Sequence, residues 1–183
     1  MARFKRQAGG CGDEPIADSP MKRPAHDPET LANRQQILRR EARLRRFGYD
    51  SPAAIRFVLA QALPLGGAVL EIGTGKGRFL VGLARHAGTI TTVDIAAEEQ
   101  RCARLNSRYA GVEGKIRFVV RDAVRLPWSD STFDAAATMN AMHHIAHFKQ
   151  VLEEMLRERG LVTRLRKGCN QEVLVARVPA AAA

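Results

Sequence analysis

The sequence has no apolar run of the roughly 18 to 20 residues that a membrane-spanning helix needs. No hydrophobic stretch follows the basic residues near its start, so an export signal is not expected either. The three cysteines, Cys11, Cys102 and Cys169, are far apart and form no C-x-x-C pair, which argues against a disulfide framework and a zinc spacing. We therefore expect a soluble, unexported protein of the reducing cytoplasm.

Motifs of several enzyme classes are also lacking. A P-loop needs Ser or Thr after its Gly-Lys pair and an earlier glycine, but Gly77 follows Lys76 and Leu70 occupies the earlier position. ATP or GTP hydrolysis is not expected. His143 and His147 are four residues apart, yet no nearby Cys, Asp or Glu completes a ligand set. The sequence therefore predicts no metal ion.

The composition predicts one domain with an added tail. The chain has 183 residues, 45% of them hydrophobic and 26% charged, which is enough to build one full core. Residues 1–26 mix Gly, Pro and scattered charges without periodicity and predict a disordered N-terminal tail. Residues 27–65 predict N-terminal helices, and residues 66–183 predict the main domain.

Two helix starts are recognisable in the N-terminal region. Asp27 can cap the free amides of a helix that begins with Pro28 and extends to about Phe47. A second helix is expected from Ser51 until Pro64 stops it.

The net charge of +10 is partly concentrated in the first of these helices. Within residues 34–46 the one acid, Glu41, opposes six arginines, which are Arg34, Arg39, Arg40, Arg43, Arg45 and Arg46. Such a run favours either a solvated helix face or a patch that binds an anionic partner such as nucleic acid. The pattern alone leaves both interpretations open.

Strand and helix patterns alternate along the main domain, which predicts a parallel sheet covered on both faces. The expected strands are residues 68–72, 89–94, 115–120 and 133–138. Helices are expected after the glycine-rich segment, with Leu80, Leu83, Ala84 and Ala87 facing the sheet, at 96–109, with Cys102, Leu105 and Tyr109 facing inward, and at 148–157. Alternation in 161–166 and 172–178 predicts a C-terminal β-hairpin. The fold class is therefore α/β, a Rossmann-like, doubly wound and mostly parallel sheet of about six strands that ends in an antiparallel hairpin.

The most informative motif runs from a hydrophobic strand through Gly73, Thr74, Gly75, Lys76 and Gly77 into a helix. Glycine allows a sharp turn and close backbone approach to a ligand. A dinucleotide-binding loop prefers G-x-G-x-x-G, and this loop instead reads G-x-G-x-G. Binding of an NAD-type cofactor is thus a weaker alternative, and a plain strand-to-helix turn is another.

Acidic residues lie at the ends of three consecutive expected strands. Glu71 belongs to the first strand, Asp94 closes the second and Asp122 closes the third. The carboxyl ends of parallel strands meet at the edge where open α/β sheets bind ligands. Asp94 would lie beside the glycine loop, where a carboxylate can accept hydrogen bonds from ribose hydroxyls.

These residues resemble the successive motifs of small-molecule class I S-adenosylmethionine-dependent methyltransferases (methyltransferase type 11-like). The motifs are Glu71–Gly77, Asp94, Asp122, Leu126-Pro127, Phe133-Asp134 and Asn140–His144, and the resemblance covers roughly residues 48–157. It implies S-adenosylmethionine as the cofactor. It also implies that Gly73, Thr74, Gly75 and Gly77 pass beneath the methionine part of that cofactor, while Glu71 helps to hold its amino group.

The same resemblance assigns the other cofactor contacts. Asp94, followed by Ile95, would hold the ribose, Asp122 and Ala123 would contact the adenine edge, and Asn140 would close the pocket near the sulfonium. His143 and His144 are the expected catalytic residues, because histidine is the most frequent general base. The Asn-Pro-Pro-Tyr motif of some nucleic-acid methyltransferases is absent, which favours a small-molecule acceptor.

The sequence departs from this family after Val151–Arg157. Relatives usually continue through a Pro-Gly-Gly turn, a fifth strand and another helix, whereas here residues 158–160 lead straight into the hairpin. We therefore expect a reduced C-terminal part, in which the hairpin fills a sheet position. Three hypotheses follow: a small-molecule methyltransferase, a cofactor-binding pseudoenzyme or shortened isoform acting through a partner, and an RNA or protein methyltransferase that uses the basic helix.

Overall fold

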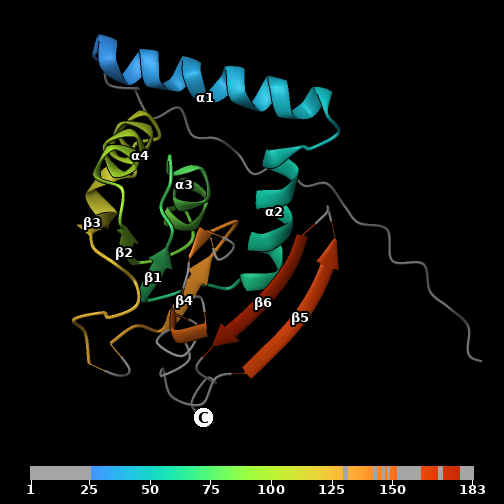
Figure 1. Ribbon diagram of the computed structural model, residues 1–183, viewed down its shortest axis with the longest axis vertical. Coiled ribbons are helices and arrows are strands. Elements are labelled where there is room, and N and C mark those ends of the chain that lie inside the picture. The colour runs from blue at the N-terminus through green and yellow to red at the C-terminus, as the bar shows by residue number, and fades with distance from the viewer. Residues whose placement is uncertain are drawn as a thin grey trace, which may run out of the picture.

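Four parallel strands form the centre of the fold in the computed structural model of the chain (Figure 1). The structure describes residues 26–129, 132–141, 144–145, 147, 149–151, 162–168 and 171–177, the last two ranges by their backbone. The strands are β1 (Ala68–Ile72), β2 (Thr89–Asp94), β3 (Ile116–Val120) and β4 (Ala135–Thr138). Their order in the sheet is β3-β2-β1-β4. The chain adds β2 and β3 on one side of β1 and then crosses back to add β4 on the other side of β1. The predicted α/β class with a parallel sheet is confirmed.

Two strand boundaries differ from the prediction. Lys115 belongs to a short 3-10 helix, η1 (Glu113–Lys115), and β3 begins one residue later. Phe133 and Asp134 precede β4, because Asp134 binds the first residue of β1 instead. The Asp134 carboxylate accepts a hydrogen bond from the Ala68 N–H at 2.7 Å, and the Asp134 N–H donates to the Ala68 carbonyl at 2.8 Å.

A further pair of strands, β5 (Val162–Gly168) and β6 (Gln171–Arg177), runs antiparallel. Strand β6 adjoins β4 where Arg177 pairs with Ala135, and it also lies beside α2 (Ser51–Ala62). The predicted hairpin falls on this segment. Its role as the completed edge of a six-stranded sheet stays a prediction.

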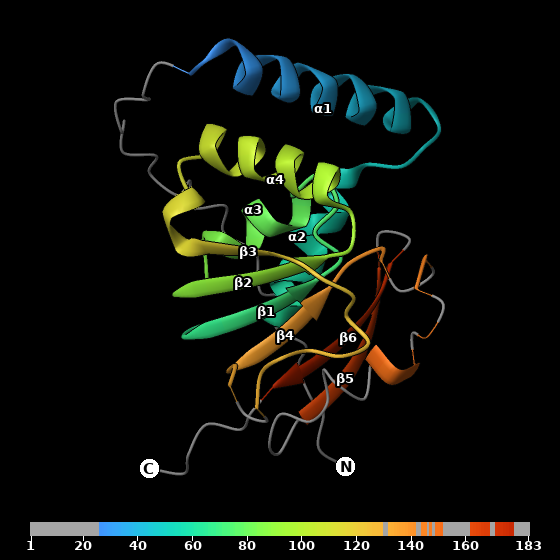
Figure 2. The same ribbon diagram turned by 60° about the vertical axis from the view of Figure 1, so that its left-hand side comes forward.

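Helices α2, α3 (Arg78–Ala84) and α4 (Ala97–Tyr109) cover one face of the sheet, and α1 (Pro28–Arg46) crosses over them (Figure 2). The two predicted N-terminal helices are confirmed. Asp27 caps α1 by accepting from the Thr30 N–H at 2.9 Å, whereas α2 is capped by Asp50, one residue before the predicted start, which accepts from the Ala53 N–H at 3.0 Å.

Strand residues alternate between two apolar clusters, as a sheet covered on both faces requires. Val69 and Ile90 pack with Leu80, Leu83, Ala84 and Ala87, the residues predicted to face the sheet. Leu70, Ile72 and Val93 pack on the other face with Ala123, Phe133 and Val151. Val151 ends the described part of the predicted helix at 148–157; the rest of that helix, like the predicted tail, falls almost wholly outside the described residues.

The predicted inward face of α4 is wrong for two of its three residues. Leu105 is buried, but Cys102 and Tyr109 are only partly buried and face α1, where the Asn33 amide donates to the Cys102 carbonyl at 3.0 Å. Polar Gln100 and Asn106 are buried instead. Helix α4 is packed on two sides, so its polar residues can be enclosed wherever they bind backbone carbonyls.

Ion pairs join α1 to the helices beneath it. Arg101 of α4 pairs with Glu29, and Arg108 lies 3.7 Å from Asp27. Glu41 pairs with Arg78 at 3.1 Å, at the start of α3. Within the described ranges, no helix is long and apolar enough to cross a membrane.

Candidate functional site

The loop from β1 to α3 depends on three glycines with positive φ angles. A Cβ atom on Gly73, at φ +85°, would lie 2.1 Å from the Cβ of Ala141, and one on Gly77, at φ +72°, would lie 2.9 Å from the Cα of Ala103. Gly75, at φ +48°, differs, because a Cβ there would meet no described atom within 4 Å. Two glycines are therefore required by packing, whereas Gly75 opens onto free space.

Asp94, the last residue of β2, fixes the tip of this loop. One carboxylate oxygen accepts a hydrogen bond from the Gly75 N–H at 2.8 Å, and the other accepts from the Ala96 N–H at 2.9 Å. The Asp94 carbonyl accepts from the Arg121 N–H at 2.9 Å, which ties the end of β2 to the end of β3. The loop and both strand ends are thus held together, as predicted for this edge of the sheet.

A buried polar chain lies behind the loop. The Thr92 hydroxyl donates to the Glu71 carboxylate at 2.5 Å and lies 2.5 Å from the Thr74 hydroxyl, which accepts from the Gln100 amide at 3.2 Å. Burial raises the pKa of Glu71 to about 8, although the hydrogen bond from Thr92 opposes the shift. Because Glu71 is only 1% exposed, it supports the loop from behind. Its predicted contact with the amino group of the cofactor stays a prediction.

A cavity of about 670 Å³ lies in front of the loop, outside the carboxyl ends of the strands. This volume is in the range of pockets that hold cofactors. Eight of the ten predicted cofactor residues line it: Gly73, Thr74, Gly75, Asp94, Ile95, Asp122, Ala123 and Asn140. Glu71 and Gly77 lie behind that lining. The cavity occupies the switch point between β1 and β4, where open α/β sheets bind ligands.

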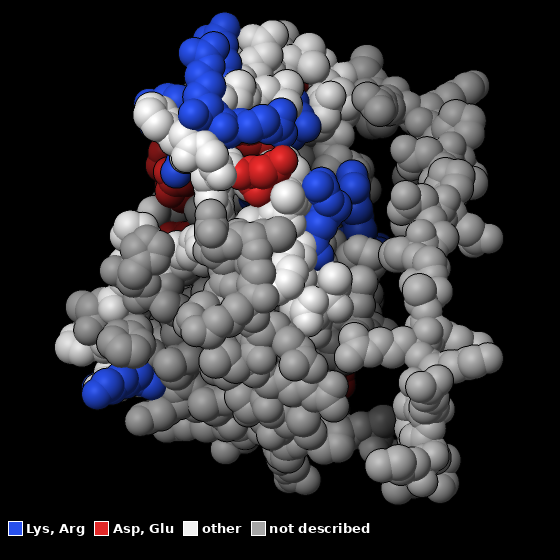
Figure 3. Space-filling model, turned by 90° about the vertical axis from the view of Figure 1, so that its right-hand side faces the viewer, with Lys and Arg blue, Asp and Glu red and all other residues white. Residues whose placement is uncertain are grey.

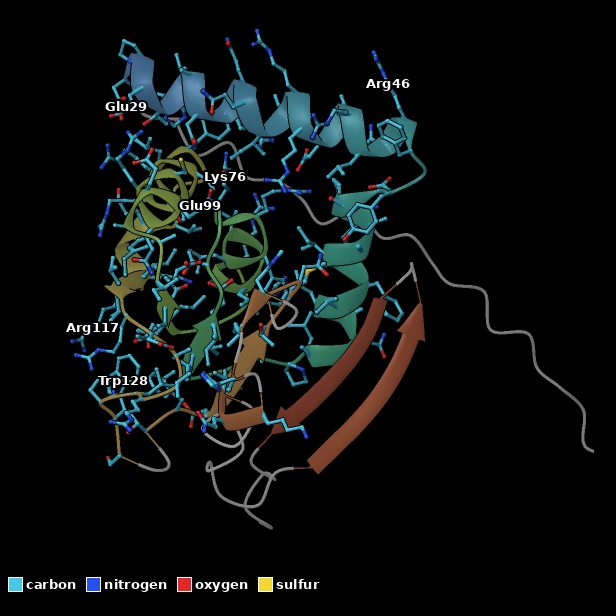
Figure 4. All side chains as sticks on the ribbon, viewed as in Figure 1. Glu29, Arg46, Lys76, Glu99, Arg117 and Trp128 are labelled. Atoms are coloured by element: carbon cyan, nitrogen blue, oxygen red, sulfur yellow. The ribbon has the colours of Figure 1, made fainter. Side chains whose placement is uncertain are left out.

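One end of the cavity combines an apolar surface with acids. Ile95 is 72% exposed, which is unusual for so large an apolar side chain, and Ala123 lies in the same lining. Asp122 accepts a hydrogen bond from the Val124 N–H at 3.0 Å, which orients its carboxylate. Lys76 and Glu99, also in the lining, lie below α1 (Figure 4). Chemically, this end suits a flat, largely apolar ring that carries hydrogen-bond donors.

Sequence reasoning missed the wall supplied by the N-terminal helices. Arg40, Tyr49 and Ile55 line the cavity, as does Arg78. The Asn140 amide donates to the Tyr49 hydroxyl at 3.1 Å and thereby joins residues 91 positions apart. Asn140 also has a positive φ of 57°, a conformation that asparagine tolerates better than most residues and that is frequent at functional sites. Its place at the end of β4 was the one sequence signal for this contact.

The predicted catalytic histidines are only partly placed. His144 lines the cavity, and so does His147, but His143 is outside the described residues. The described residues contain no group of three or more His, Cys, Asp or Glu side chains arranged to hold a metal ion.

The switch-point cavity and its glycine loop define a cofactor-binding α/β fold, and the comparisons with known proteins specify the class. Residues 70–158 match the family described as "Methyltransferase domain". This region is a class I S-adenosylmethionine-dependent methyltransferase domain, and S-adenosylmethionine is its cofactor.

Three similar proteins illustrate the match. Norajmaline N-methyltransferase from Rauvolfia serpentina is 33% identical over 90 residues, which cover 49% of this chain and 31% of that protein. Demethylmenaquinone methyltransferase from Porphyromonas gingivalis is 30% identical over 92 residues, covering 49% and 38%. Among solved structures, the [4+2]-cyclase SpnF has a TM-score of 0.55 at 27% identity and covers 66% of this chain and 48% of that chain. The chain spans about a third of the length of these two curated relatives.

Proposed function

We propose that the chain binds S-adenosylmethionine in the cavity described above and transfers its methyl group to a small-molecule acceptor. One observation carries this proposal: a single cavity is lined by the glycine loop, by the acids that end β2 and β3, and by helices α1 and α2. The cofactor fits these residues, because Gly75 leaves open space where a side chain would stand and Ile95 offers a bare apolar surface next to Asp94.

Different residues of the cavity bind different parts of the cofactor. Asp94 accepts hydrogen bonds from the ribose hydroxyls, and its bond to the Gly75 amide keeps the loop in register. Ile95 and Ala123 contact the adenine ring, and Asp122 accepts from the adenine edge. Asn140, fixed by Tyr49, closes the cavity near the reacting centre.

The chemistry requires little more than alignment. Bound S-adenosylmethionine supplies a methyl group on a positively charged sulfonium. Direct displacement is accelerated when the protein holds donor and acceptor in line and excludes water, so no covalent intermediate with the protein is required. Tyr49 and Ile55, from the α1–α2 region, form the wall that excludes water. His144 and His143 remain our candidates for a general base that removes the acceptor's proton.

A small molecule is the acceptor class that the comparisons favour. Two relatives are named for norajmaline and demethylmenaquinone, both small organic compounds. The cavity wall formed by α1 and α2 also encloses the acceptor side. We therefore propose that residues 27–65 work as one unit with residues 66–183, and that β5 and β6 complete the edge of the sheet beyond β4.

Label transfer tests this function. The chain is incubated with S-adenosylmethionine carrying a radiolabelled methyl group and with cell extract separated into metabolite, lipid, RNA and protein fractions. We expect label in the metabolite or lipid fraction with the native chain and none with Asp94→Ala. Label in no fraction, from a chain that binds the cofactor, would refute transfer.

The second candidate is cofactor binding without methyl transfer. A similar fold is named as a cyclase, and the chain corresponds to about a third of its curated relatives. A given fold can carry different reactions. Binding of S-adenosylhomocysteine in calorimetry, together with no label in any fraction, would favour this candidate.

The third candidate is an RNA or protein acceptor. Lys and Arg side chains gather over α1 at the top of the face seen in Figure 3, and Arg46 points away from the body of the molecule (Figure 4). Binding of RNA to such a helix would weaken steeply with salt. Weak RNA binding that does not change with salt would remove this candidate.

A further inference from the structure

The outer face of α1 has no partner among the described elements. Figures 1 and 2 show α1 as the outermost helix, with α3 and α4 on its inner side. The inner face of α1 is buried around Ile37. Both acids of α1 form ion pairs with the helices beneath it, Glu29 with Arg101 and Glu41 with Arg78. The outer face therefore presents no free carboxylate.

An apolar stripe runs along this outer face. Leu31 and Leu38 are seven residues apart and Ala42 follows four residues later, a spacing that places side chains on one side of a helix. The two leucines are 45% and 46% exposed. Phe47, directly after the last residue of α1, is 82% exposed. Large apolar side chains that gather on one exposed face mark an interaction surface, whereas single ones are ordinary.

Arginines border the stripe on both sides. Arg39, Arg43 and Arg46 follow one side at spacings of four and three residues, and all three are exposed. Arg45 lies on the other side, with 62% of its side chain exposed. No ion pair within the described part of the chain involves the first three, and Arg46 points away from the body of the molecule (Figure 4). The outer face of α1 thus combines aliphatic side chains with guanidinium groups.

This combination fits an anionic lipid surface better than RNA or a second copy of the chain. Guanidinium groups bind phosphate, which lipid headgroups and RNA both present. Leucine side chains gain free energy by entering the boundary between headgroups and acyl chains, whereas single-stranded RNA is held by stacking on aromatic rings. The stripe itself is aliphatic. A second copy that packed against the same face would bring like charges together.

We propose that the outer face of α1 attaches the chain reversibly to membrane surfaces that contain anionic phospholipids. Helix α1 lies in the plane of the surface, its arginines bind lipid phosphates, and its leucines enter the headgroup region. The attachment uses no residue that binds the cofactor. It is therefore tested separately from the proposed function.

Co-sedimentation of the full chain with vesicles tests the proposal. Vesicles of phosphatidylcholine alone are compared with vesicles of phosphatidylcholine and phosphatidylglycerol in equal parts. We expect the native chain to sediment with the anionic vesicles at low salt and to be released from them as the salt concentration rises. With the neutral vesicles it should stay in solution.

Two sets of substitutions separate the charges from the apolar stripe. The triple variant Arg39→Gln, Arg43→Gln, Arg46→Gln should raise the Kd for anionic vesicles roughly 100-fold, because each arginine near such a surface contributes about fivefold in affinity. The double variant Leu31→Ser, Leu38→Ser should raise it roughly 10-fold, because the exposed part of each leucine no longer enters the bilayer.

A matched control removes the same number of charges elsewhere. Arg56→Gln, Arg85→Gln and Arg117→Gln change exposed arginines outside α1, so together they should alter the Kd for anionic vesicles much less than the α1 triple variant does. Circular dichroism checks that every variant is folded, as expected for substitutions of exposed side chains.

Several results would overturn the proposal. They are a native chain that binds neither kind of vesicle or both kinds equally, a control variant as weak as the α1 triple variant, and a leucine variant with native affinity. RNA is the remaining alternative occupant. Tighter binding of a single-stranded RNA oligonucleotide than of anionic vesicles at the same salt, unaffected by the leucine substitutions, would assign the face to nucleic acid instead.

Discussion

The carboxylate of Asp94 accepts a hydrogen bond from the backbone N–H of Gly75 at 2.8 Å, so the acid that ends β2 also sets the position of the glycine loop. The residue proposed to bind the ribose and the loop proposed to pass beneath the methionine arm therefore form one unit. Changes at Asp94 should affect both.

Substitution of Asp94 tests this unit. Asparagine keeps one acceptor oxygen but loses the charge, whereas alanine loses both acceptors. We expect the Kd for S-adenosylhomocysteine to rise about 10-fold in Asp94→Asn and about 100-fold or more in Asp94→Ala, because each lost hydrogen bond to a charged group is worth about 1.5 to 3 kcal/mol. Isothermal calorimetry measures both values, and Glu113→Gln, outside the cavity lining, is the control. Equal affinities for all four proteins would count against the assignment.

The two glycines of the loop should respond differently to alanine. Gly75→Ala places a methyl group in open space, so it loses only the roughly 1 to 2 kcal/mol that a left-handed residue costs. Gly73→Ala adds a collision with Ala141, for which overpacking costs about 1 to 3 kcal/mol more. Urea unfolding should therefore find Gly73→Ala the less stable variant.

Gly75→Ala should weaken cofactor binding, although it is the less destabilising of the two substitutions. This variant loses only about 1 to 2 kcal/mol of stability and stays folded, but it places its methyl group beside the bound ligand, so we expect weaker binding of S-adenosylhomocysteine by a folded protein. A folded Gly75→Ala protein with native affinity would show that the ligand does not pass over this residue.

Glu71 should make the stability of the fold fall as pH rises. Its pKa of about 8 in the folded protein lies above the ordinary value of 4.5. Below pH 4.5 Glu71 is protonated in both the folded and the unfolded state, so it adds no pH dependence to the free energy of unfolding. Between these values the unfolded chain releases the proton while the folded chain keeps it, so stability falls by about 1.4 kcal/mol per pH unit at most. Above pH 8 the loss is complete.

Glu71→Gln removes this dependence, because the amide does not ionise. We measure the free energy of unfolding of both proteins with urea. We expect the value for the variant minus that for the native protein to increase from pH 5 to pH 8 and to stay constant from there to pH 9. Two parallel stability curves over that interval would show that Glu71 is ionised in the folded state.

Much of the fold and part of the site could be predicted from sequence. Strands β1 and β2 and the start of α1 follow from hydrophobic runs and from the Asp27-Pro28 cap, which are local signals. Asp94 and Asp122 could be placed together because parallel strands bring their carboxyl ends to one edge.

Other features depend on contacts that no local pattern records. Tyr49 reaches the cavity only because α1 and α2 fold over the sheet, and the buried face of α4 includes Gln100 because the Val119 carbonyl lies within reach of its amide. Glu71 fits the motif of a ligand-binding acid, yet its neighbours Thr92 and Thr74 enclose it. Long-range packing decided these positions.

Ile95 offers a test of the apolar end of the cavity. Its side chain is 72% exposed, so Ile95→Ser should leave the free energy of unfolding within about 0.5 kcal/mol of native, as for most surface substitutions. Affinity for S-adenosylhomocysteine should fall about 10-fold or more, because burying such a side chain against a ligand contributes roughly 1.5 to 3 kcal/mol. Leu38→Ser, at a 46% exposed leucine of α1 outside the cavity lining, is the control. Native affinity in both variants would contradict adenine contact at Ile95.

A crystal structure of the chain with S-adenosylhomocysteine tests the central claim most directly. We predict density for one molecule in the cavity, with the ribose at Asp94, the adenine between Ile95 and Ala123, and the amino-acid arm over Gly75. Density for the ligand at another surface, or an empty cavity in crystals soaked at saturating concentration, would contradict the account.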